Sequence, residues 1–363
     1  MNAIKADDEL KLWLIVTGMH LSLEFGLTIG AIEDDGFTVD ERVEMLLSSD
    51  TPEAIAKSMG LGTIGFGQLF GRKRPDVLVV LGDRFEMHAA AVAALPFKIP
   101  VAHLHGGEIT EGAIDDALRH SMTKLSHLHF VATEEYARRL IQMGEEPWRV
   151  TVCGALSLDN IRSMRLLTRD ELEHKIGVCL EKPPLMVTFH PVTLEYERTE
   201  WQIDELLHAL QSFNLPVVFS MPNADTSGRI ISEKLRSFVS ARPTACLVES
   251  LGTQAYFSLM SVAAAMVGNS SSGILEAPSF ELPVVNIGNR QQGRTRAGNV
   301  IDVDYDSASI VAGIQKAIDS KFRSTLRGRP NPFGSGQAAA MIVRSLKEVE
   351  LGSRLLTKKF HNA

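Results

Sequence analysis

Cysteine is scarce in this chain of 363 residues, and its three cysteines are scattered. Cys153, Cys179 and Cys246 form no C-x-x-C pair, so a disulfide framework or a zinc site is disfavoured and a reducing compartment is expected. The polar start of the chain, MNAIKADDEL, lacks the apolar core of a signal peptide. Because no apolar run has the length of a membrane span either, we expect a cytoplasmic protein without a membrane partner.

Positive charge is also in short supply, since the formal net charge is −7. A general nucleic-acid-binding role is therefore disfavoured, and any phosphate must be bound by local donors. Neither G-x-G-x-x-G nor G-x-x-x-x-G-K-[ST] occurs, so nicotinamide-dependent and P-loop functions lack their fingerprints. What remains is an ordinary globular composition, 45% hydrophobic, in a chain long enough for two domains.

Short apolar runs alternate with helical segments along most of the chain, which predicts right-handed βαβ units and an α/β fold with two lobes. For the first lobe, residues 1–168, the expected strands are Leu10–Thr17, Asp76–Gly82, Ile99–Leu104, His127–Ala132 and Val150–Cys153. For the second lobe, residues 169–363, they are Leu185–His190, Leu215–Met221, Ala245–Glu249, Ala264–Gly268 and Pro283–Ile287. A closing helix is expected at Gly336–Val349.

Polar side chains follow the predicted strands of the first lobe, at the edge where open α/β sheets bind ligands. Asp83 could act as an acid or base and Arg84 could pair with phosphate, but a helix cap explains Asp83 equally well. His105 and Glu108 share a glycine-rich loop, and this concentration of titratable groups favours a functional role over a solvated turn.

The helix expected after that loop begins with two aspartates. Asp115 and Asp116 lie four and three residues before Arg119, so simple surface ion pairs are one explanation. The other is a crowded carboxylate with a raised pKa that removes a proton from carbon. The spacing alone leaves both open.

In the second lobe, GNSSSG is the most specific signal. Ser270, Ser271 and Ser272 lie between a strand and a helix, where hydroxyls and free amides suit a diphosphate, and Glu276 could accept hydrogen bonds from a ribose. His190 ends another strand and could meet phosphate or protonate a leaving group.

Two further loops of this lobe are less specific. Arg294 lies in NRQQGRTRAGN, which could clamp an anion or be solvated. Asn223, in MPNAD, could read a base or ribose, although an Asx turn is the commoner role of such a residue.

Taken in order, GDRFE, HLHGGEITEGAIDDALRHSMTKLSHLHF, TFHPVT, MPNADTSGR, GNSSSGILEAP and GNRQQGR resemble the hydrolysing UDP-N-acetylglucosamine 2-epimerases. The resemblance implies two Rossmann-like lobes in the glycosyltransferase-B arrangement with an interlobe cleft. It implies a homodimer and a UDP-sugar substrate, with no metal and no cofactor. Family members make N-acetylmannosamine for sialic acid synthesis, and a close branch acts on nucleotide-linked N,N′-diacetylbacillosamine on the way to legionaminic acid.

The implied reaction removes the proton at sugar C2 while UDP leaves C1, and water then adds to the glycal. The residue patterns and the resemblance together give the candidate residues for catalysis and substrate binding. The catalytic set is Asp83, Glu108, Asp115 and His190; the binding set is Arg84, His105, Asp116, Arg119, Asn223, Ser270, Ser271, Ser272, Glu276 and Arg294. Many relatives carry Glu at the position of His105, while others carry His.

The start of the chain departs from the family pattern, which opens with a strand and a turn like TGTRADYG. We therefore expect that the first lobe lacks its usual first strand and that the natural reading frame extends upstream. Three other functions stay open. They are a non-hydrolysing epimerase, a glycosyltransferase on the same scaffold, and a non-catalytic nucleotide-sugar-binding protein.

Overall fold

The computed structural model describes residues 1–111, 113–178, 180–222 and 225–362. Cys179 and the predicted binding residue Asn223 lie outside this part of the chain. The chain divides into two compact units. Unit 1 comprises Met1–Glu108, Ile114–Arg162 and Phe333–Ala363, and unit 2 comprises Ile109–Ala113 and Ser163–Pro332. The predicted α/β fold with two Rossmann-like lobes is confirmed.

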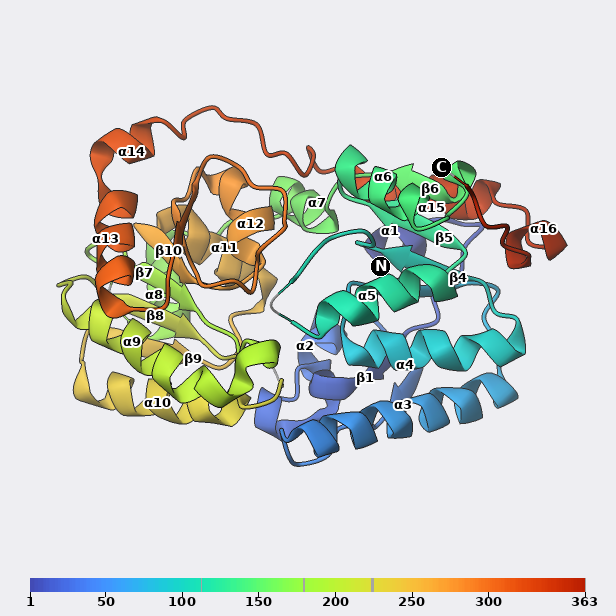
Figure 1. Ribbon diagram of the computed structural model, residues 1–363, viewed down its shortest axis with the longest axis horizontal. Coiled ribbons are helices and arrows are strands. Elements are labelled where there is room, and N and C mark those ends of the chain that lie inside the picture. Colours follow the sequence, from blue (N-terminus) through green and yellow to red (C-terminus); the bar gives the residue numbers. More distant parts are fainter. Residues whose placement is uncertain (112, 179, 223–224, 363) are drawn as a thin grey trace. The chain divides into compact units, whose positions relative to one another are not determined.

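Unit 1 contains two separate parallel sheets, one of order β1-β2 and one of order β3-β4-β5-β6. The strands are β1 (Ile15–Thr17), β2 (Glu41–Val43), β3 (Leu78–Leu81), β4 (Val101–Leu104), β5 (Leu128–Val131) and β6 (Val150–Val152). The helices are α1 (Asn2–Lys5), α2 (Ile29–Asp34), α3 (Pro52–Arg72), α4 (Phe85–Ala94), α5 (Asp115–Leu125), α6 (Glu134–Gln142), α7 (Leu156–Ser163), α15 (Ala338–Glu348) and α16 (Ser353–Leu356). Helices α3, α4 and α5 lie side by side (Figure 1).

Unit 2 is built on one parallel sheet of six strands, in the order β12-β11-β10-β7-β8-β9. Its strands are β7 (Leu185–Thr188), β8 (Val217–Ser220), β9 (Ala245–Val248), β10 (Ala265–Gly268), β11 (Val284–Ile287) and β12 (Val300–Val303). Its helices are α8 (Arg169–Ile176), α9 (Thr199–Gln211), α10 (Gly228–Ala241), α11 (Gly252–Val262), α12 (Ser272–Leu275), α13 (Ser307–Ile318) and α14 (Ser320–Ser324). Helix α9 lies beside α10 and α13 (Figure 1).

The strands that the sequence predicts are present, and two short ones were missed. β2 carries two charged residues in three, and β12 is interrupted by Asp302, so neither forms the apolar run that identifies a buried strand. By contrast β4, β5, β7, β10 and β11 are buried at every position, as expected of strands covered on both faces.

The C-terminal segment corrects the predicted lobe assignment, because Phe333–Ala363 belongs to unit 1. Ala338 and Ile342 of α15 pack in one apolar cluster with Leu104 and Phe130 of the β3–β6 sheet. Arg149 donates hydrogen bonds to the carbonyls of Leu355 and Thr357 and so anchors the tail that follows. Amphipathic periodicity predicted this helix, but it contains no information on which sheet the apolar face covers.

Among the described residues, no helix is both long and apolar enough to cross a membrane.

Candidate active site

The turn after β3 positions Asp83 at the carboxyl end of the sheet. Helix α4 takes Arg84 as its N-cap and has no side-chain cap bond, so Asp83 does not have the capping role that was one explanation of its position. The His103 Nε2–H donates to the carbonyl of Gly82 over 2.7 Å. Burial lowers the pKa of His103 to about 4, so the ring is neutral at physiological pH and acts as a fixed donor. His103 thus holds the turn that carries Asp83, a role that the sequence analysis missed.

Arg119 is the centre of the polar cluster in unit 1. Its side chain is 2% exposed and forms an ion pair with Asp83. Nη1 donates to the carbonyl of Glu108 over 3.0 Å and lies 3.7 Å from a carboxylate oxygen of Asp116. A buried guanidinium of this kind favours the ionised form of neighbouring carboxylates and fixes their orientation. The predicted pair of Asp116 and Arg119 exists, but burial of the arginine distinguishes it from a surface ion pair.

His105 and Glu108 form a second pair in the loop after β4. The His105 Nδ1–H donates to Glu108 Oε1 over 2.7 Å, while the Leu156 N–H donates to Nε2 over 3.4 Å. Both ring nitrogens of His105 therefore have protein partners, and the ring orients Glu108. The backbone of His105 has φ +64°, an unfavourable region for a residue with a Cβ. Such local strain is common at functional sites.

Helix α5 presents both predicted aspartates in its first turn, within the same unit. Asp115 is 5% exposed, and Asp116 has an oxygen 3.4 Å from Nε2 of His120. Arg84 pairs instead with Glu86 of its own helix, with 3.4 Å between Nε and Oε2. Asp83, Glu108, Asp116 and Arg119 are thus joined directly, and Arg84 has a separate carboxylate partner.

In unit 2 the candidate residues gather where the strand order reverses, between β7 and β10. Such a switch point is where open α/β sheets bind ligands, outside the carboxyl ends of the strands. His190 follows β7, and the serine turn follows β10. At the end of β10, Gly268 has φ +135° and a Cβ there would lie 2.0 Å from the Thr188 carbonyl oxygen, so only glycine fits.

Asn269 joins these two segments and is fully buried. Its Oδ1 accepts from the His190 N–H over 2.7 Å, and its Nδ2 donates to the His190 carbonyl over 2.8 Å. Its own carbonyl accepts from Gln291 Nε2 over 2.8 Å and from Arg290 Nη1 over 3.3 Å. Asn269 belongs to the GNSSSG motif, but only the structure reveals this role, because its partners lie far away in the sequence.

The helix that follows the serine turn is short, since α12 has only four residues. The Ser272 N–H donates to Ser270 Oγ over 3.3 Å, and Ser271 is the N-cap of the helix. The Tyr256 hydroxyl, which the sequence analysis missed, lies near the side chains of Ser272, Thr188 and Ser270. Burial raises the pKa of Tyr256, which keeps this hydroxyl protonated. Tyr256 lies on α11 in a segment with no local motif that could have identified it.

Arg294 contacts the short segment Ile109–Ala113 within unit 2. Nε donates to the Ile109 carbonyl over 2.9 Å, and Nη2 donates to Thr110 Oγ1 over 3.1 Å. Arg296 pairs with Asp302. Glu276 follows α12 and is 7% exposed. The loop predicted either to clamp an anion or to be solvated is therefore an ordered segment with specific protein contacts.

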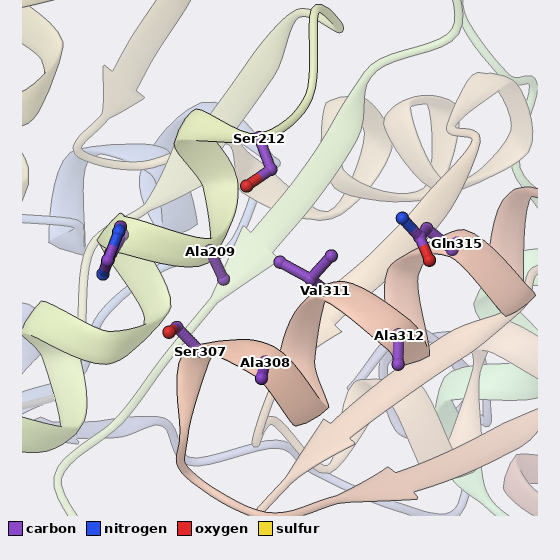
Figure 2. Close-up of a pocket in the computed structure, with 8 residues that line it drawn as sticks. Ala209, Ser212, Ser307, Ala308, Val311, Ala312 and Gln315 are labelled. Atoms are coloured by element: carbon purple, nitrogen blue, oxygen red, sulfur yellow. The ribbon is translucent and has the colours of Figure 1, made fainter.

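A separate pocket lies between α9 and α13, and none of the candidate residues lines it. Its wall includes Ala209, Ser212, Ser307, Val311 and Gln315 (Figure 2). Among the described residues there is no cluster of three or more His, Cys, Asp or Glu side chains that could hold a metal ion.

Known proteins resemble this chain over nearly its full length. A GDP/UDP-N,N′-diacetylbacillosamine 2-epimerase (hydrolyzing) of Campylobacter jejuni is 44% identical over 305 residues, covering 84% of this chain and 79% of that protein. A UDP-N,N′-diacetylbacillosamine 2-epimerase (hydrolyzing) of Legionella pneumophila is 36% identical over 359 residues, covering 99% of this chain and 93% of that protein.

The fold is also similar to solved structures of 2-epimerases. UDP-GlcNAc 2-epimerase from Neisseria meningitidis, bound to UDP-GlcNAc, aligns with a TM-score of 0.79 at 19% identity, covering 95% of this chain and 94% of that one. The sequence profile described as UDP-N-acetylglucosamine 2-epimerase matches residues 2–347. The chain therefore belongs to the UDP-N-acetylglucosamine 2-epimerase family.

Proposed function

We propose that this chain is a hydrolysing 2-epimerase of nucleotide-linked N,N′-diacetylbacillosamine. The observation that carries the proposal is the similarity, over 99% of the chain, to a relative with that activity. From the sequence motifs, N-acetylglucosamine was the first candidate for the sugar of the substrate and the diacetylated sugar was the second. The names of the relatives described above favour the diacetylated sugar.

The reaction combines an elimination with a hydration. A base takes the C2 proton, the C2–H electrons form the C1=C2 double bond, and the C1–O bond breaks with its electrons on the departing nucleoside diphosphate. Water then adds its hydroxyl to C1. A proton adds to C2 on the face opposite to the one from which the first proton was removed. The products are a nucleoside diphosphate and a free sugar inverted at C2.

Unit 1 supplies the acid–base groups in this proposal. Asp83, Glu108 and Asp115 are carboxylates at or beside the carboxyl ends of β3 and β4, and positioned carboxylates contribute about 10²- to 10⁴-fold to proton transfer. Arg119 and His105 orient Asp83 and Glu108 through the contacts described above. Arg84 and Asp116 contribute to binding of the sugar nucleotide.

Unit 2 supplies nucleotide binding. The hydroxyls of Ser270, Ser271 and Ser272 bind the diphosphate, and Glu276 binds the ribose. His190, held by Asn269, stabilises the charge that develops on the leaving diphosphate. Arg294, in the loop NRQQGRTRAGN, is predicted to contribute to substrate binding, and Asn223 is predicted to contact the nucleotide.

The second candidate is the same reaction on UDP-N-acetylglucosamine, favoured by the family description that matches residues 2–347. A competition between the two sugars separates them. We expect the chain to turn over the UDP- or GDP-linked diacetylated sugar with the higher kcat/KM.

The test is product analysis by NMR in D₂O. We expect free nucleoside diphosphate and a free sugar inverted at C2, with one deuterium at C2. A product that keeps its nucleotide would indicate a non-hydrolysing epimerase, and sugar transfer that requires an acceptor would indicate a glycosyltransferase. Nucleotide binding without turnover of either sugar would leave only the binding function. The homodimer stays a prediction.

A further inference from the structure

Two loops of unit 2 that carry candidate site residues are joined by one short hydrogen bond. Glu195 follows His190 in the segment after β7, and Asn289 precedes Arg290 in the segment after β11. Asn289 Nδ2 donates to Glu195 Oε1 over 2.6 Å. This bond joins residues that are 94 positions apart in the sequence. Glu195 lies in the short 3-10 helix Thr193–Arg198 and Asn289 lies in a loop, so neither belongs to the sheet.

Further polar contacts fix both partners of this bond. Gln202 Nε2 donates to the other oxygen of Glu195 over 2.8 Å, so both carboxylate oxygens are engaged. The Tyr305 hydroxyl donates to Asn289 Oδ1 over 3.1 Å, so both polar atoms of the amide are engaged as well. The contacts therefore specify which atom of Asn289 faces the carboxylate.

The same two loops are joined a second time, through Asn269. Asn269 holds the backbone of His190 with two hydrogen bonds, and Arg290 donates to the Asn269 carbonyl. The contacts close a ring around the His190 segment, made by His190, Asn269, Arg290, Asn289 and Glu195. Asn269 holds the segment at its start, and the Glu195–Asn289 bond holds it five residues later.

We propose that Glu195 and Asn289 are positioning residues that hold the His190 segment for departure of the nucleotide. The proposal rests on the proposed function, which places His190 at the leaving diphosphate. Glu195 and Asn289 are each half-buried, and their bond joins no two strands of the sheet. Its loss should therefore affect the segment more than the fold of unit 2.

The chain offers a swap of the two groups as a test. Asn289→Asp places a carboxylate against Glu195, and the two charges repel. Adding Glu195→Gln restores one amide and one carboxylate with their places exchanged. The Gln amide then donates to the Asp and its oxygen accepts from Gln202, while Tyr305 still donates to the Asp. Asn286→Asp is the matched control, because Asn286 Nδ2 donates to Asp302 Oδ1 over 2.8 Å between β11 and β12.

We expect Asn289→Asp to lower kcat by about tenfold to a hundredfold, the range for loss of a charge-assisted hydrogen bond. The Kd of UDP should change by less than about threefold, because a hydrogen bond outside the serine turn is lost. The double variant should recover kcat to within about threefold of the original chain. The control Asn286→Asp should also have a kcat within about threefold of the original chain. Hydrogen exchange of a peptide covering residues 189–199 should rise in Asn289→Asp, fall back in the double variant, and stay unchanged in the control.

The proposal is overturned if Asn289→Asp changes neither kcat nor exchange beyond the control, or if the double variant rescues neither. Hydrogen exchange separates this from failure of the proposed function, since it requires no turnover. A chain that turns over neither sugar, but shows the exchange pattern and its rescue, contradicts the proposed function and keeps the ring as the device that holds His190.

Discussion

The two units differ in the number of their sheets and in how completely their strands are buried. Unit 2 has a single sheet of six strands, and its central strand β7 is buried at all four positions. Unit 1 has its strands in two sheets, and on β3 the side chains of Val79 and Leu81 are 37% and 51% exposed. β1 pairs only with β2 and β3 only with β4, so each leaves an edge unpaired by another described strand. Unpaired apolar edges are liabilities that proteins usually cover or charge.

The two units also differ in what they bury. Unit 1 encloses ionisable groups, including Arg119, Glu145 and His103. The site of unit 2 is organised by amides and hydroxyls, such as those of Asn269, Ser272 and Tyr256. Unit 2 also buries charged side chains, including Glu276, Arg290 and Arg294, so the two units differ in degree. In the proposed function, proton transfer belongs to unit 1 and nucleotide binding to unit 2.

The largest effect that would test this contrast is expected from Arg119→Ala. The substitution leaves Asp83 without its cationic partner, and breaking a buried ion pair typically costs about 3–5 kcal/mol. We also expect kcat to fall by about 10³-fold, because the carboxylates lose their orientation. Denaturant unfolding and steady-state kinetics measure both effects. Arg165→Ala removes an exposed pair with Glu171 and is the control, with an expected change below about 1 kcal/mol. Equal losses in the two variants would contradict the assigned role of Arg119.

The second largest effect is expected from acidification, which should destabilise unit 1 more than unit 2. Burial lowers the pKa of His103 and of His127 to about 4, and it also lowers the pKa of His129; all three lie in unit 1. Between pH 6.5 and 4 the unfolded chain then binds more protons than the folded one, so the free energy of unfolding falls as the pH falls. The effect is on the order of 3 kcal/mol for each of His103 and His127.

Tryptophan fluorescence measures this contrast, because Trp13 and Trp148 report on unit 1 and Trp201 on unit 2. In a Trp201→Phe chain, the unfolding midpoint should drop steeply over this pH range. In a chain with both Trp13→Phe and Trp148→Phe, it should change less. If Trp201 reports the earlier transition, the assignment of acid sensitivity to unit 1 is wrong.

The smallest effect concerns the exposed side of β3. Leu81→Thr should change the free energy of unfolding by less than about 0.5 kcal/mol, because the side chain is half exposed. Val80→Thr is the matched control, since Val80 is 1% exposed and a buried hydroxyl costs about 1–3 kcal/mol. Thermal unfolding of both variants measures the difference. A loss above about 1 kcal/mol in Leu81→Thr would show that the side chain of Leu81 is covered.

The sequence predicted the parts of the molecule that depend on local pattern. Buried parallel strands are continuous apolar runs, and loops after strands carry recognisable motifs, so β7 and the serine turn could be located from the sequence alone. Other features depend on residues far apart in the chain. That Arg119 is buried between Asp83 and Glu108, and that α15 covers the sheet of unit 1, follow from tertiary packing. Tyr256 and the Glu195–Asn289 bond have no local signature for the same reason.

The division of roles between the units is tested most directly by measuring UDP affinity and kcat together in Asp83→Asn and Ser272→Ala. For Asp83→Asn we expect kcat to fall by about 10²- to 10⁴-fold, with the Kd of UDP within about threefold of the original value. For Ser272→Ala we expect UDP to bind about tenfold or more weakly, the effect of one lost hydrogen bond to a charged group. A weaker affinity for UDP in Asp83→Asn, together with unchanged affinity in Ser272→Ala, would contradict the account.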